Sequence, residues 1–80
     1  MKKIRVMLAD DHPIVMTGFA MSLEGQGLEV VAQARTPAEA LAQYQELKPD
    51  VIVLDIRFGE QLTGLDVARQ ILAQTPSAAI

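Results

Sequence analysis

Three aspartates stand at the carboxyl ends of two apolar runs. Asp10 and Asp11 follow the run from Ile4 to Ala9, and Asp55 follows the run from Val51 to Leu54. If these runs are neighbouring strands of one parallel sheet, about 4.8 Å apart, their ends bring the three carboxylates into one acidic pocket. Crowded carboxylates repel one another, and a hard divalent cation relieves the repulsion. Mg²⁺ suits such a pocket because it binds one or two carboxylates and keeps water or phosphate oxygens elsewhere.

A second interpretation gives these aspartates a structural role. An aspartate at a strand end can cap the following helix, and Asp11 is close enough to Pro13 to do so. That would be the better explanation of a lone aspartate. An adjacent pair, with a third aspartate after another buried strand, favours a functional pocket. His12 could act as a base or a metal ligand, but we interpret it as a surface residue near a helix start.

Such a pocket needs strands that alternate with helices, and the apolar pattern predicts them. Strands are expected over residues 4–9, 28–34 and 50–55, the first and third buried on both faces. Pro13 opens the first helix, the capping box Thr36-Pro37-Ala38-Glu39 opens the second, and prolines end the second and third. The apolar stripe of the first helix is Ile14, Val15, Gly18, Phe19, Ser22 and Leu23, and that of the third is Leu65, Ala68, Ile71 and Leu72.

This order of elements predicts an α/β fold with a parallel sheet and helices on both faces. Residues 77–80 look like the opening of a fourth strand, so we expect a truncated domain. The chain has 80 residues, a net charge of -3, no basic cluster and no cysteine, which argues against nucleic-acid binding and excludes thiolate metal sites. With neither a signal peptide nor about 20 consecutive apolar residues, the composition indicates a cytoplasmic protein without a membrane partner.

Three segments together resemble the receiver domain of two-component response regulators. They are Val6-Met-Leu-Ala-Asp-Asp-His-Pro-Ile-Val15, Pro49-Asp-Val-Ile-Val-Leu-Asp55 and Gly64-Leu-Asp66. The Asp-Asp-His-Pro form is similar to the branch that usually carries a C-terminal helix-turn-helix DNA-binding domain. The resemblance implies a flavodoxin-like, doubly wound sheet with strand order 2-1-3-4-5 when complete. Residues 1–80 would be its N-terminal portion, β-α-β-α-β-α plus the start of a fourth strand, with the output domain absent.

The resemblance also implies a role for each site residue. Asp55 matches the phosphoacceptor, which takes a phosphoryl group from a sensor histidine kinase as an acyl phosphate. Asp11 matches the direct Mg²⁺ ligand, Asp10 the acid that acts through a metal-bound water, and the backbone carbonyl of Arg57 completes the metal site. DNA would be reached only through the missing domain. The chain would not be an enzyme, because it accepts the group on its own aspartate.

The segment after Asp55 departs from the usual receiver pattern. Phe58 and Gly59 replace a Met-Pro pair, and Gly64 lies nine residues after Asp55, which makes the loop one residue longer than usual. The side chain of Arg57 either influences the lifetime of the phosphate or is simply solvated. Receivers also use a Ser or Thr and a Lys from later strands, beyond Ile80. We therefore expect that these 80 residues alone neither signal nor hold a long-lived phosphate.

Three other functions are alternatives to the phosphoacceptor. A truncated or degenerate receiver could act without phosphorylation as a dimerisation module, by pairing an exposed sheet edge with a second copy. An aspartate-nucleophile phosphohydrolase would need an acid two residues after Asp55, where this chain has Arg57. A nucleotide-binding fold is weaker still, because no glycine-rich loop follows the first strand.

Overall fold

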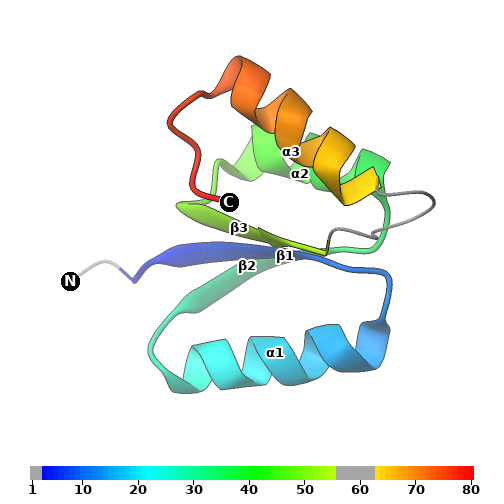
Figure 1. The fold of residues 1–80 in the computed structure, drawn as a ribbon. Coiled ribbons are helices and arrows are strands. Elements are labelled where there is room, and N and C mark those ends of the chain that lie inside the picture. The colour runs from blue at the N-terminus through cyan, green and yellow to red at the C-terminus, as the bar shows by residue number, and fades with distance from the viewer. Residues whose placement is uncertain (1–2, 56–62) are drawn as a thin grey trace.

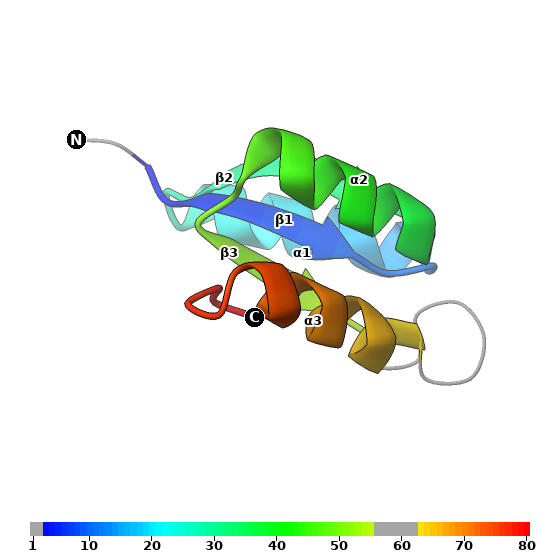
Figure 2. The same ribbon diagram turned by 90° about the horizontal axis from the view of Figure 1, so that it is seen from above.

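Strands and helices alternate along the chain in the computed structural model, which describes residues 3–55 and 63–80. The strands pair in parallel in the order β2-β1-β3, and α1 covers one face of the sheet while α2 and α3 cover the other (Figures 1 and 2). This arrangement confirms the predicted α/β fold and strand order. The elements are β1 (Arg5–Ala9), α1 (Pro13–Gly25), β2 (Glu29–Ala34), α2 (Pro37–Leu47), β3 (Val51–Leu54) and α3 (Thr63–Gln74).

The central strand, β1, contributes to two hydrophobic clusters because its side chains alternate between the faces of the sheet. Met7 and Ala9 point toward α2 and α3, whereas Val6 and Leu8 point toward α1. The cluster under α2 and α3 contains Met7, Ala9, Ala34, Ala40, Tyr44, Ile52, Val67 and Ile71. The cluster under α1 contains Val6, Leu8, Met16 and Ala20. The two-faced burial predicted for the first strand is therefore confirmed.

The buried face of α1 differs from its predicted apolar stripe. Met16 and Ala20 are buried, while Ile14 is 88% exposed and Phe19 47% exposed. The helix is apolar around most of its circumference, so helical spacing alone does not select the face that meets the sheet.

Helix α3 shows the same kind of difference on a smaller scale. Val67 and Ile71 are buried, whereas Leu65 and Leu72, which the sequence pattern placed on the apolar stripe, are exposed. Ile71 is the one member of the predicted stripe that reaches the core. The helix itself ends at Gln74, directly before Thr75-Pro76, as predicted.

Helix α1 ends in a Schellman motif. The backbone N–H of Gly27 donates to the carbonyl of Glu24 at 3.0 Å, and that of Leu28 donates to the carbonyl of Leu23 at 3.1 Å. Gly27 has φ +89°, which a residue without Cβ adopts without strain. Leu23 and Leu28 both pack against the cluster under α1. The motif thereby turns the chain back into β2.

Helix α2 begins at the predicted cap. Thr36 Oγ1 accepts a hydrogen bond from the backbone N–H of Glu39 at 3.1 Å. The carboxylate of Glu39 accepts from the N–H of Arg35 at 2.9 Å, one residue before the cap, rather than from the cap residue of a standard capping box. Lys48, in the left-handed region at φ 47°, ends the helix directly before Pro49.

Two irregularities occur in the sheet. Between β1 and β2 the register shifts by one residue, because Val6 pairs with Val30 and Met7 pairs with Ala32, so Val31 is an extra residue in β2. On the outer side of β3, Ala79 forms an isolated parallel bridge with Val51. That bridge lies within the segment predicted to open a fourth strand. Among the described residues, no helix is both long and apolar enough to span a bilayer.

Candidate metal centre

The sheet positions Asp10 and Asp55 through hydrogen bonds that continue past the strands. The backbone N–H of Asp10 donates to the carbonyl oxygen of Ala34, the last residue of β2, at 3.1 Å. The N–H of Asp55 likewise donates to the carbonyl oxygen of Ala9, the last residue of β1, at 3.1 Å. The backbone of each aspartate is therefore fixed to the last residue of a neighbouring strand. Both aspartates lie at the carboxyl ends of the strands, on the same side of the sheet's ends.

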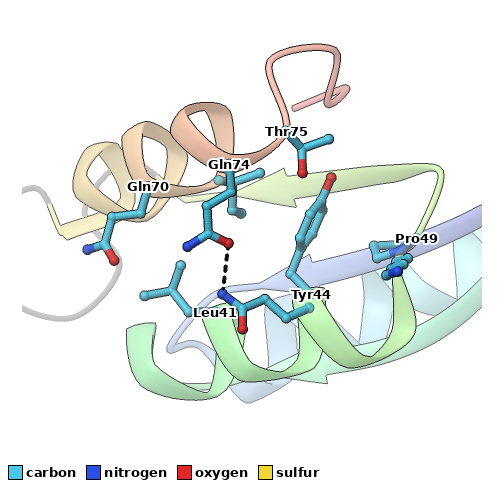
Figure 3. A pocket seen from close by; sticks show the side chains of 9 residues that line it. Leu41, Tyr44, Pro49, Gln70, Gln74 and Thr75 are labelled. Carbon is cyan, nitrogen blue, oxygen red and sulfur yellow. Dashed lines mark hydrogen bonds between the residues drawn. The ribbon is translucent and has the colours of Figure 1, made fainter.

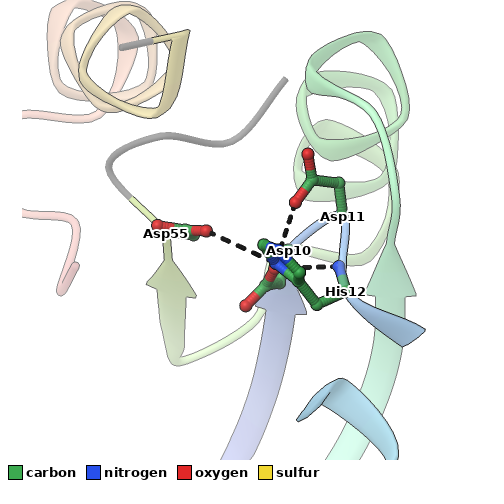
Figure 4. A group of neighbouring side chains, drawn as sticks. All are labelled: Asp10, Asp11, His12 and Asp55. Atoms are coloured by element: carbon green, nitrogen blue, oxygen red, sulfur yellow. Dashed lines mark hydrogen bonds and ion pairs between the residues drawn. The ribbon is translucent and has the colours of Figure 1, made fainter. Parts of the chain in front are cut away.

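The structure brings the three predicted carboxylates together with one imidazole (Figure 4). One potential ligand atom from each of Asp10, Asp11, His12 and Asp55 lies within 4.8 Å of the others, a set that we call the acidic cluster. The side chains of Asp10 and Asp55 are 21% and 28% exposed, and that of Asp11 is 40% exposed. The cluster is therefore open to ions and water from solvent while its backbone is anchored in the sheet.

His12 holds the middle of this cluster. Its Nδ1 lies 2.7 Å from Asp10 Oδ1, 3.0 Å from Asp11 Oδ1 and 4.0 Å from Asp55 Oδ2. Its backbone N–H also donates to Asp10 Oδ1 at 2.9 Å. The side chain is 66% exposed, as the sequence predicted, but its contacts with the three aspartates were not anticipated. The signal that could have found them is its position directly after an aspartate pair.

These contacts raise the pKa of His12 above its ordinary value of 6.5. The largest cause is the hydrogen bond with Asp10, followed by the negative charges of Asp11 and Asp10, with a smaller contribution from Asp55. A nearby carboxylate favours the charged imidazolium, which explains the direction. The protonated ring offsets part of the negative charge in the cluster.

The capping interpretation of Asp11 is not what the structure shows. The N-cap of α1 is His12, and no side chain makes a cap hydrogen bond there. One carboxylate oxygen of Asp11 is directed at the His12 ring instead (Figure 4). Asp11 thus belongs to the cluster rather than to the helix start.

The segment after Asp55, which was predicted to contribute to the site, is not among the described residues. Arg57, whose backbone carbonyl was predicted to complete the metal site, lies outside the described residues. The same holds for Phe58 and Gly59, which carry the departures from the usual receiver pattern. Their roles stay predictions.

A groove of about 490 Å³ lies between α2 and α3, toward the amino end of β3 (Figure 3). Gln45 Nε2 donates a hydrogen bond to Gln74 Oε1 across it at 2.9 Å, and Tyr44 and Ile71 contribute to its wall. None of the described residues that line it is an aspartate, glutamate or histidine. Within residues 3–55 and 63–80, the group of side chains that could hold a metal ion is the acidic cluster.

Comparison with known proteins identifies the class to which this fold and cluster belong. Residues 6–80 match the response regulator receiver domain, and the chain belongs to that family. It is 40% identical over 74 residues to the response regulator GacA of Pseudomonas viridiflava, and 35% identical over 77 residues to the chemotaxis protein CheY of Listeria monocytogenes. A solved structure of a LuxR-family two-component response regulator from Aurantimonas is 36% identical, with a TM-score of 0.88.

The relatives are longer than this chain. The matches cover 91% of this chain but 34% of GacA, and 96% of this chain but 64% of CheY. The Aurantimonas match covers 96% of this chain and 55% of the solved one. The similarity therefore defines a receiver domain, and what the whole of each relative does is a separate question.

Proposed function

We propose that this chain is a phosphorylated receiver, in which Asp55 accepts a phosphoryl group with the help of Mg²⁺. The observation that carries the proposal is the convergence of Asp10, Asp11 and Asp55, from the ends of two adjacent strands, within 4.8 Å of one another. Membership of the receiver family supports the same conclusion. A carboxylate nucleophile gives an acyl phosphate, which is labile, so the phosphorylation is reversible.

The donor set fits Mg²⁺. Asp10, Asp11 and Asp55 offer hard carboxylate oxygens from an open edge of the sheet, and the carbonyl of Arg57 would complete the ligands. When bound there, the ion neutralises charge on the oxygens of the transferred phosphoryl group, which is the main requirement of phosphoryl transfer. In this proposal Asp11 would hold the ion directly, and Asp10 would support it from the second coordination shell.

In this proposal the chain supplies the nucleophile and holds it in position. A carboxylate oxygen of Asp55 attacks the phosphorus of the donor, the new O–P bond forms as the bond from phosphorus to the leaving atom breaks, and the leaving atom keeps the electron pair. The N–H of Asp55 bound to Ala9 keeps the nucleophile at the strand end during this displacement. Positioning of this kind supplies much of the rate of such reactions.

The donor and the readout follow from the family branch that the Asp-Asp-His-Pro motif resembles. We propose a sensor histidine kinase as the physiological donor and a DNA-binding output domain as the element that phosphorylation controls, which places the chain in the cytoplasm. Phosphorylation would bias a two-state surface, as charge-adding modifications do. The chain itself would not turn over a substrate, because its product is its own phosphorylated Asp55.

The test is phosphorylation by acetyl phosphate with and without Mg²⁺, measured as a mass increase of one phosphoryl group on the intact protein. We expect Mg²⁺-dependent but short-lived and substoichiometric modification of the wild type and none of Asp55→Asn. Asp66→Asn is the matched control, because Asp66 lies on α3, where it contacts Arg69 at 3.9 Å, and it is not a member of the cluster. Equal labelling of wild type and Asp55→Asn would refute the assignment.

Self-association without phosphorylation is the second candidate. One observation favours it: Val15, Phe19 and Val53 border an apolar groove of about 290 Å³ between α1 and β3, and each of these side chains is partly exposed. A second copy that covered this groove would bury all three. Mass in solution with and without Mg²⁺ and phosphodonor separates the candidates, because a dimer that forms equally in all conditions favours the interaction module.

A further inference from the structure

We propose that the groove between α2 and α3 binds a nucleotide whose base carries a lactam edge, as guanine and uracil do. The groove lies toward the amino end of β3, whereas the acidic cluster lies at the carboxyl ends of β1 and β3 (Figure 3). The inference therefore concerns a second site and does not depend on phosphorylation of Asp55. The volume of the groove, about 490 Å³, falls within the range of about 300–1,000 Å³ typical of small-ligand sites.

The walls of the groove offer apolar surface to a flat ring. Leu41 and Tyr44 contribute from α2 and Ile71 from α3, and Pro49 lies at the end next to β3. The ring of Tyr44 is buried in the cluster under α2 and α3, which fixes its position, and its hydroxyl is directed at Thr75 (Figure 3). A base between these walls would exchange water for apolar contacts, and its aromatic face suits a tyrosine neighbour.

Three side-chain amides supply polar contacts in the groove. Gln45 lies on α2, and Gln70 and Gln74 lie one turn apart on α3. Gln45 Nε2 donates to Gln74 Oε1 at 2.9 Å, and both side chains are exposed, so a ligand can reach them. A carboxamide has an acceptor oxygen and an NH₂ donor, so each of these two side chains keeps a further group for a ligand. A lactam edge, with an N–H beside a carbonyl, can form two hydrogen bonds with one carboxamide.

The charges at one end of the groove favour the phosphate of a nucleotide. Lys48 is the one charged residue among the described residues that line it, in a chain whose net charge is -3. Arg5 Nη1 donates to the carbonyl of Lys48 at 3.1 Å, which brings a second cation to the same end. The carboxylate of Asp50 accepts the backbone N–H of Arg5 at 2.8 Å and balances one of these cations. One positive charge therefore remains there for an anionic group.

The helix ends oppose this charge only in part. Both α2 and α3 end at the groove, and the free carbonyls of a last turn disfavour an anion. Here the carbonyl of Tyr44 accepts the N–H of Lys48 at 2.9 Å, and that of Ile71 accepts the N–H of Thr75 at 2.7 Å. Because these carbonyls already have donors, we expect the ammonium of Lys48 to dominate the interaction with a phosphate.

The test is an NMR titration of the isotope-labelled wild type with GMP, guanosine and ribose 5-phosphate, without a phosphodonor. We expect saturable shifts at the residues that line the groove. GMP should bind about threefold more tightly than guanosine, since an exposed ion pair contributes little. Ribose 5-phosphate should bind at least about fivefold less tightly than GMP, because it lacks the base and its stacking.

Two variants test the amide and the ammonium separately. Gln45→Met keeps an unbranched helical side chain but removes the carboxamide, and it should weaken GMP about tenfold. Gln33→Met is the matched control, because Gln33 is exposed on β2 and does not line the groove. Lys48→Asn removes the charge while asparagine tolerates the left-handed backbone at φ 47°, and it should abolish the preference for GMP over guanosine.

Several results would overturn the inference. They are shifts that do not map to the groove, equal binding of ribose 5-phosphate and GMP, equal losses in Gln45→Met and Gln33→Met, and a preference for GMP that survives Lys48→Asn. The ligand series on the wild type needs no variant, so a variant that fails to fold leaves the test intact. Asp55→Asn should bind GMP as the wild type does, which keeps this inference separate from the proposed phosphorylation.

Discussion

Replacing Asp11 by Asn should change stability in opposite directions with and without Mg²⁺. Asp11 carries a charge within 4.8 Å of two other carboxylates, and its carboxylate is 40% exposed. Without a metal, the variant removes repulsion from the folded state that the extended unfolded chain largely lacks. With Mg²⁺, the same substitution removes a ligand, so the wild type should gain more from the ion.

The stability that Asp11→Asn gains without a metal can be estimated from the distances between the carboxylates. At 4.8 Å, the outer limit of the ligand-atom distances, Coulomb's law with the dielectric constant of water gives about 0.9 kcal/mol for each pair of charges. Two pairs give about 1.7 kcal/mol. Loss of the 3.0 Å contact with His12 offsets part of this. We expect a net gain of about 1 kcal/mol, which raises Tm by about 4–8 °C in a domain of this size.

The assay is thermal unfolding at about pH 9, well above the ordinary pKa of an imidazole, in low salt with a chelator and again with Mg²⁺. The variant should melt above the wild type in the chelator. In excess Mg²⁺ the order should reverse, because an ion that binds only the folded state stabilises it by RT ln(1 + [Mg²⁺]/Kd), and the wild type has the lower Kd. In about 1 M salt the difference should shrink, since the Debye length of about 3 Å is then shorter than the charge separations.

Two outcomes would refute the reasoning. If Asp11→Asn is less stable than the wild type in the chelator, the three carboxylates do not crowd one another. If Mg²⁺ stabilises both proteins equally, Asp11 is not a ligand. Asp66→Asn serves as the control for loss of a charge, and in low salt it should lose a few tenths to about 1 kcal/mol both with and without Mg²⁺, because Asp66 lies in the first turn of α3.

Three further predictions concern other parts of the molecule. NMR titration should place the pKa of His12 above 6.5 and show a lower value in Asp10→Asn. Because the pKa of His12 is higher in the folded state, its contacts with the aspartates stabilise the fold fully below the unfolded pKa. That contribution is lost as pH rises through the folded pKa. Ile52→Ala should cost about 2–5 kcal/mol in denaturant unfolding, since Ile52 is fully buried, and a smaller loss would mean that the core closes the cavity. Gly27→Ala should cost about 1 kcal/mol because φ is +89°, and unchanged stability would contradict the helix-end assignment.

The sequence predicted which elements form but not which helix faces are buried. The first and third strands were recognisable because their apolar runs end at acidic residues, and the second because apolar residues partly alternate along residues 28–34. Helix starts were recognisable because proline and threonine occupy characteristic positions. The face of α1 could not be predicted, since Ile14 and Phe19 are as apolar as Met16 and Ala20. The choice depends on how the helix lies across the sheet, which is a property of tertiary packing.

The site was likewise predicted in part: the sequence indicated that the aspartates meet, but not where the His12 ring lies. That Asp10 and Asp55 meet follows from strand order and from the rule that carboxyl ends of parallel strands share an edge. The position of the His12 ring follows from a turn in which one carboxylate oxygen of Asp10 accepts both the backbone N–H and a contact from Nδ1. A turn of that kind is set by local hydrogen bonds, which residue spacing does not specify.

The extra residue in β2 gives this chain a place where its length can change. Val30 and Ala32 now face opposite clusters although they are two residues apart, because Val31 interrupts the alternation. A chain without Val31 would keep both side chains on their present faces, since consecutive strand residues alternate. A residue lost from β1 or β3 would instead turn Asp10 or Asp55 toward the wrong face. Over evolutionary time, we expect insertions and deletions to be tolerated at position 31 and removed from the two strands that carry the acids.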